Sequence, residues 1–152
     1  MVTPAERYFE DYHVGMVDEF GSVLVTAEEI VEFARRYDPQ TMHVDAVAAG
    51  SGRFGGLIAS GWHTVALFMG MYVRGVLLDS ASLGSPGVEE LRWLAPVRPG
   101  DELRGRSTIT DVRASSTNPS RGTVFSSSEV VNQEGTVVMT MRARGFFARR
   151  PP

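Results

Sequence analysis

The spacing of hydrophobic positions changes from helical to strand-like about halfway along the chain. An apolar stripe in the first half recurs at intervals of three and four, at Ile30, Val31, Phe33, Ala34 and Tyr37. This spacing is typical of an amphipathic helix. Thr26 and Glu29 stand where a capping box begins such a helix. Pro39 disfavours helical geometry at Asp38, so the helix is predicted over residues 27–37.

The longest apolar helical pattern runs from Gly61 to about Leu78. Apolar side chains cover nearly every face of this segment, which predicts a buried helix. Ser60 stands at the position where a serine commonly caps a helix start. Between the two long helices, residues 45–49 are expected to form a short helix and residues 50–56 a loop.

Segments rich in β-forming residues lie on both sides of the long helix. The predicted strands cover residues 19–25, 88–95, 102–113, 123–132 and 136–148, with the last two joined as a hairpin around 133–135. Strands segregated from helices predict an α+β domain, in which a curved antiparallel sheet wraps around the Gly61–Leu78 helix. Without a repeat or a long linker, we expect a single domain over residues 1–152, with a core at about 8–148.

Composition narrows the classes of function. With 43% hydrophobic and 22% charged residues, the 152-residue chain has an ordinary globular balance. The absence of cysteine excludes a disulfide framework and a thiolate nucleophile. A net charge of −3 with scattered basic residues argues against a nucleic-acid partner. No apolar run approaches the roughly 18 residues of a membrane span, and the start lacks a secretory pattern, so we expect a cytoplasmic protein without a membrane partner.

Asp38 and His43 are the first candidate pair for chemistry. The chain has three histidines, His13, His43 and His63, and a single histidine is more often structural than catalytic. His43, however, follows Asp38 by five residues in the segment after the first helix. A carboxylate and an imidazole in one short irregular segment can converge on a single water, and imidazole titrates near neutrality. The alternative is a solvated loop in which Asp38 favours a turn.

Gly61 stands at the predicted N-terminus of the long helix. Free backbone N–H groups at a helix start stabilise negative charge, and a glycine lets a ligand approach them closely. Such an N–H suits a thioester carbonyl that becomes an oxyanion. The alternative reading is tight packing of the helix against the sheet.

Two other patterns are rejected. Gly50, Gly52 and Gly55 spell a dinucleotide-binding fingerprint, but that motif needs a preceding strand and an immediate helix, and neither is predicted there. The spacing of His43, Asp45 and His63 matches no common metal-binding pattern, so we expect no metal site.

Four segments carry a recognisable pattern: YDPQTMHVD at 37–45, FGGLIASGWHT at 54–64, GSPG at 84–87 and RWLAPVRPGD at 92–101. Together they resemble the MaoC-like dehydratases and the (R)-specific enoyl-CoA hydratases. The resemblance implies a hot-dog fold, a homodimer, a catalytic Asp38–His43 pair and an oxyanion donor at the Gly61 N–H. Gln40 and Thr41 replace the usual asparagine and proline of the family motif, and Ser60 replaces a frequent histidine.

The implied reaction adds water to a trans-2-enoyl thioester or removes it from a 3-hydroxyacyl thioester. Asp38 is the preferred base in this reading. Coenzyme A enters as part of the acyl-CoA substrate, with no separate cofactor, and the expected substrate contacts are Ser60, Arg53 and Phe54. Arg53 is the first arginine to test for a phosphate contact, ahead of Arg92 and Arg98.

Two alternative functions remain open, and the oligomeric state can also be predicted. The first alternative is a hot-dog acyl-CoA thioesterase, which usually needs a carboxylate on or beside the long helix; only Asp79, beyond its end, is available. The second is a non-catalytic acyl-thioester-binding module. A lone hot-dog sheet leaves an exposed edge, so we expect a homodimer or a higher homo-oligomer.

Overall fold

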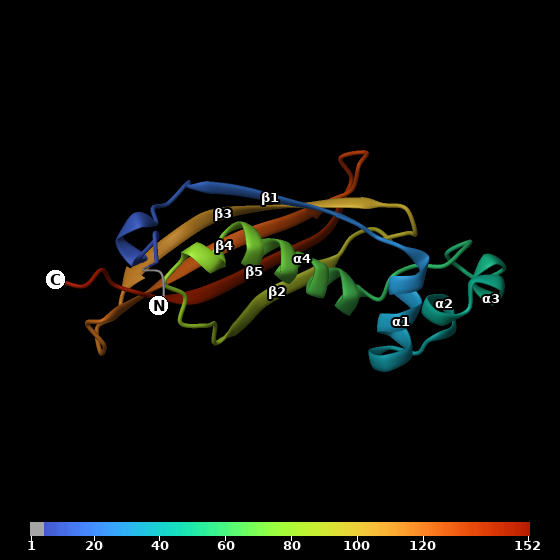
Figure 1. Ribbon diagram of the computed structural model, residues 1–152, viewed down its shortest axis with the longest axis horizontal. Helices are drawn as coiled ribbons and strands as arrows, with labels where there is room; N and C mark the ends of the chain where they lie inside the picture. The colour runs from blue at the N-terminus through green and yellow to red at the C-terminus, as the bar shows by residue number, and fades with distance from the viewer. Residues whose placement is uncertain (1–4) are drawn as a thin grey trace.

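A five-stranded antiparallel sheet forms the body of the computed structural model, which describes residues 5–152 (Figure 1). The strands lie in the order β1-β3-β4-β5-β2. Their bounds are β1 Val17–Leu24, β2 Gly87–Trp93, β3 Glu102–Ala114, β4 Arg121–Val131 and β5 Val137–Ala148. Each predicted strand is present, with ends displaced by a few residues. The sheet therefore has β1 and β2 as its two edges.

Residues 5–152 also form four α-helices: α1 Ala27–Tyr37, α2 Thr41–Val44, α3 Ala46–Gly50 and α4 Gly61–Gly75. Short 3-10 turns cover Phe9–Asp11 and Leu77–Asp79. Figure 1 shows α4 lying across one face of the sheet and α1, α2 and α3 gathered at one end of it. This arrangement confirms the predicted α+β, hot-dog architecture. Within residues 5–152, no helix is long and apolar enough to cross a membrane.

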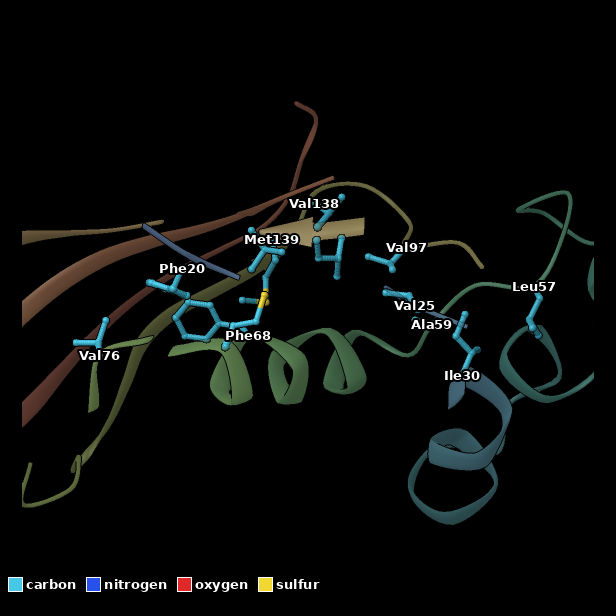
Figure 2. Close-up of a cluster of buried hydrophobic side chains, with 13 residues drawn as sticks. Phe20, Val25, Ile30, Leu57, Ala59, Phe68, Val76, Val97, Val138 and Met139 are labelled. Carbon is cyan, nitrogen blue, oxygen red and sulfur yellow. The ribbon is translucent and has the colours of Figure 1, made fainter. Parts of the chain in front are cut away.

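The main hydrophobic core lies between α4 and the sheet and continues to α1 (Figure 2). Phe68 and Met71 of α4 are buried against strand residues such as Phe20, Leu103 and Met139. The prediction that α4 is buried on every side is wrong, because Trp62 and Met69 on this helix are 57% and 46% exposed. A sheet covers only one side of a helix, and apolar residues on the other side remain open in the single chain.

Local signals determine where α1 begins and ends. Thr26 Oγ1 accepts a hydrogen bond of 3.2 Å from the Glu29 backbone N–H, which supplies the expected cap. The helix ends at Tyr37, and Asp38 takes a non-helical conformation with φ −154° and ψ 70° before Pro39. The expectation of an irregular segment up to His43 is wrong, because Thr41–Val44 forms α2. A helix of four residues is too short to show a periodic pattern.

Candidate active site

Asp38 and His43 face each other beside the N-terminus of α4. Asp38 follows the last residue of α1, and His43 lies on α2. The distance from Asp38 Oδ2 to His43 Nε2 is 3.4 Å. The His43 side chain is 5% exposed and that of Asp38 is 18% exposed, so the pair is largely buried but open to a small molecule on the Asp38 side.

A hydrogen bond selects the tautomer of His43. Its Nδ1 lies 2.7 Å from the Ile58 backbone carbonyl oxygen. A carbonyl oxygen only accepts, so His43 Nδ1 must carry the hydrogen and donate it. In neutral His43, the Nε2 that faces Asp38 is therefore an acceptor. Two acceptors, Nε2 and Oδ2, then point toward one place, which suits a water that donates one hydrogen to each.

Each oxygen of the Asp38 carboxylate accepts a hydrogen bond from a neighbouring side chain. Gln40 Nε2 donates to Oδ1 at 2.8 Å, and Ser60 Oγ donates to Oδ2 at 2.7 Å. Partial burial alone would raise the Asp38 pKa, but these two hydrogen bonds and the nearby His43 together lower it below its ordinary value. Asp38 is therefore a carboxylate near neutral pH.

Ser60 has two roles in the geometry. Its side chain is fully buried, and its Oγ also accepts a hydrogen bond of 3.3 Å from the Trp62 backbone N–H, as expected for the α4 cap. One hydroxyl therefore joins the start of α4 to Asp38. The expected substrate contact of Ser60 stays a prediction, and in the structure its hydroxyl contacts Asp38.

Gly61 is the first residue of α4, and within residues 5–152 no acceptor is found for its backbone N–H. The Trp93 indole crosses directly over this glycine. Trp93 Nε1 donates to the Gly61 carbonyl oxygen at 2.9 Å, and a Cβ added to Gly61 would lie 2.3 Å from the indole ring. Tight packing therefore explains the glycine, and its free N–H leaves the oxyanion role open. Both readings of Gly61 are compatible with this geometry.

The pair opens into a cleft of about 430 Å³. The polar part of its lining includes Asp38, Gln40, His43 and Thr64. The rest of the lining includes Met42, Phe54, Gly61, Trp62, Trp93 and Leu94. Phe54 thus lies in the cleft, as expected for a substrate contact. Arg53 does not line this cleft and instead borders an adjacent hollow on the other side of Phe54.

The sequence reasoning missed three contributors to the site. From the sequence, Gln40 was noted only as a replacement for asparagine. Its place two residues after Asp38 could have predicted its hydrogen bond to that carboxylate. The Ile58 carbonyl and Trp93 carried no such signal, because each reaches the site from a distant part of the chain.

His63 does not join the pair. It is buried and stacks on Phe33 with ring centroids 4.7 Å apart. Burial lowers the His63 pKa, which the charge of Glu29 offsets only in part. Residues 5–152 contain no group of three or more histidine and acidic side chains placed to hold a metal ion.

A sheet wrapped around a central helix is the hot-dog arrangement, and the Asp38–His43 pair lies at the start of that helix. A family model described as "MaoC like domain" matches residues 13–132. The chain therefore belongs to the MaoC-like domain family.

Individual relatives agree with this assignment. The crystal structure of the MaoC-like dehydratase from Rhodospirillum rubrum has a TM-score of 0.88 and 39% sequence identity, covering 95% of this chain and 99% of that one. The 3-hydroxyacyl-thioester dehydratase Z of Mycobacterium tuberculosis is 32% identical over 110 residues, or 71% of this chain and 73% of that protein. Mesaconyl-CoA hydratase of Cereibacter sphaeroides is 30% identical over 92% of this chain, which corresponds to only 40% of that hydratase.

Proposed function

We propose that the chain is a hydratase or dehydratase of acyl thioesters, and of acyl-CoA in particular. The observation that carries the proposal is the Asp38–His43 pair, with two acceptor atoms 3.4 Å apart in a cleft at the start of α4. The names of relatives that act on 3-hydroxyacyl thioesters and mesaconyl-CoA support this reaction class.

In the proposed hydration, His43 is the base and Asp38 is its electrostatic partner. This assignment replaces our initial preference for Asp38, because neutral His43 presents a free Nε2 and the lowered pKa makes Asp38 a weak base. Both residues orient one water toward C3 of the enoyl thioester. Asp38 then stabilises the imidazolium that forms when the water loses a proton.

Hydration forms a bond from the water oxygen to C3 and moves one proton to C2 by way of His43. The water oxygen forms a bond to C3 while its proton moves to His43 Nε2, and the electrons of the double bond shift onto the thioester oxygen as an enolate. The Gly61 N–H donates to that oxyanion. The enolate carbon C2 then takes the proton from Nε2, which restores neutral His43. Dehydration of a 3-hydroxyacyl thioester follows the same steps in reverse.

An apolar cavity of about 270 Å³ between α4 and the sheet supports an acyl substrate. Its α4 side begins at Val65, directly after Thr64 of the cleft, and continues along the helix through Phe68, Met69 and Tyr72. The sheet side comes from β2, β3, β4 and β5. We assign the acyl chain to this space, because apolar lining suits a hydrocarbon chain.

The proposed assembly is a homodimer formed through β2. This strand is a sheet edge, paired with β5 on one side only among the described strands. Val88, Trp93 and the following Leu94 are about half exposed, and Trp62 and Met69 of α4 add to the exposed apolar side chains of the chain. An exposed apolar edge strand is a template for pairing with a second copy.

The function is tested with crotonyl-CoA and the purified protein. Loss of the enoyl thioester absorbance, with 3-hydroxybutyryl-CoA as the only product by mass spectrometry, is the expected result. Release of free thiol would instead indicate the thioesterase. Binding of crotonyl-CoA and of a panel of longer and branched enoyl-CoAs, without turnover of any of them, would indicate the non-catalytic module.

A further inference from the structure

A second hollow adjoins the cleft at Phe54. This hollow has a volume of about 660 Å³ and shares Gln40, Met42 and Phe54 with the cleft as lining residues. Among residues 5–152, Arg53 is the one charged residue in its lining. The side chain of Phe54 therefore lies between the Asp38–His43 cleft and a hollow that is bordered by a guanidinium group.

Two arginines flank Phe54 from different parts of the chain. The Arg53 guanidinium lies over the Phe54 ring, 5.6 Å from its centroid. Arg98 belongs to the loop after β2, and its Nη2 donates to the Phe54 carbonyl oxygen at 2.6 Å. Both side chains are exposed. Two positive charges from different parts of the chain therefore lie beside Phe54, at the edge of the cleft.

Neither guanidinium has a carboxylate within 4 Å in residues 5–152, whereas Arg92 is paired with Glu90. The acidic residues nearby in the sequence are already engaged. Asp45 caps α3 by accepting from two backbone N–H groups. Asp101 accepts from the Arg98 backbone N–H and from a glutamine side chain. In a chain of net charge −3, this local positive charge remains available for an anion.

We propose that Arg53 and Arg98 form a binding site for the phosphate groups of the pantetheine-linked carrier of the acyl group. The inference rests on the proposed function, because it requires the thioester to lie in the cleft with its carrier pointing outward past Phe54. Guanidinium groups suit this role, since their N–H donors match phosphate oxygens geometrically. Coenzyme A and a phosphopantetheinylated carrier protein share this chemistry.

The experiment compares three crotonyl thioesters: those of coenzyme A, dephospho-coenzyme A and pantetheine. They differ in phosphate groups and share the reacting end. The variants are Arg53→Gln, Arg98→Gln and their combination. Arg35→Gln is the matched control, because Arg35 is an exposed arginine on α1 that lines neither the cleft nor the hollow.

Each single variant is expected to lower kcat/KM for crotonyl-CoA by up to about fivefold, as for an exposed ion pair. The double variant should lose more, the loss should shrink at high salt, and crotonyl-pantetheine turnover should not change. A loss of kcat/KM that is confined to crotonyl-CoA assigns the arginines to the 3′-phosphate of coenzyme A. A loss that crotonyl-dephospho-CoA shares assigns them to the diphosphate, which is the group most similar to the phosphate on the pantetheine of a carrier protein. Equal losses on all three thioesters, or no loss on coenzyme A, would overturn the proposal.

A second readout separates this proposal from the proposed function. If the wild-type protein hydrates none of the three thioesters, turnover of the panel of longer and branched enoyl-CoAs decides the function, while calorimetry with free coenzyme A and pantetheine tests the arginines independently. Tighter binding of coenzyme A in the wild type, reduced in the double variant, supports the phosphate site. Equal binding of the two compounds would contradict it.

Discussion

Substitution of Ser60 by alanine tests the link between the start of α4 and Asp38. The variant removes a hydrogen bond of 2.7 Å to Asp38 Oδ2 and a cap bond of 3.3 Å from the Trp62 N–H. A hydrogen bond to a charged group contributes about 1.5–3 kcal/mol, and loss of a helix cap costs about 0.5–2 kcal/mol. Asp38 can regain water on its open side, so we expect the free energy of unfolding to fall by about 2–3 kcal/mol.

The same variant should raise the pH at which Asp38 titrates. The Ser60 hydroxyl stabilises the carboxylate and thereby lowers the Asp38 pKa. Without it, the Asp38 pKa rises, and the carboxylate is protonated at a higher pH than in the wild type. The Asp38 carboxyl signal in an NMR titration should therefore change at a higher pH than in the wild type. Denaturant unfolding and this NMR titration measure the two effects.

Thr26→Ala is the matched control for the cap. Thr26 caps α1 through a bond of 3.2 Å to the Glu29 N–H and lies at the opposite end of that helix from Asp38. It should lose about 0.5–2 kcal/mol of stability without a change in the titration of Asp38. If Ser60→Ala behaves like Thr26→Ala, with a lower stability and an unchanged Asp38 titration, the role assigned to the Ser60–Asp38 contact is refuted.

Three further predictions concern Gly61, His63 and the exposed strand. Gly61→Ala should cost about 1–3 kcal/mol by overpacking against Trp93, and Trp93→Ala in the same chain should recover much of that loss in denaturant unfolding. His63 has a lowered pKa in the folded state, so stability should fall as pH drops below about 6.5 toward that pKa, and thermal melts of His63→Phe should show a weaker acid dependence. Val88→Lys on β2 should shift the protein to monomer in sedimentation, and an unchanged dimer would exclude this edge as the interface.

Features that depend on neighbours in the sequence were predictable. Thr26 and Pro39 mark the ends of α1 because capping and proline geometry act within a few residues. Asp38 and His43 are close in the chain, so their proximity was predictable, although Ile58 and Ser60 hold their side chains from further along it. The main error within this region was α2, because its four residues show no period.

Features that depend on the sheet were not predictable in the same way. Ser60 and Trp93 reach their partners Asp38 and Gly61 across 22 and 32 residues, respectively. The exposure of one side of α4 could not be predicted from the sequence, for a related reason. Hydrophobicity shows that a face prefers burial, but it does not show whether the covering surface comes from the same chain. The placement of Arg53 beside the cleft, and not in it, likewise depends on how the loop at 50–56 folds back.

The most direct test of the central claim is the turnover of crotonyl-CoA by Asp38→Asn and His43→Gln, measured beside Asp45→Asn. Asp45 is two residues from His43, caps α3 and does not line the cleft, and asparagine can still cap a helix. We expect the first two variants to fold normally and to lose about 100- to 10,000-fold in kcat, and Asp45→Asn to retain wild-type turnover. Near-wild-type turnover in either Asp38→Asn or His43→Gln would contradict the assignment of the chemistry to this pair.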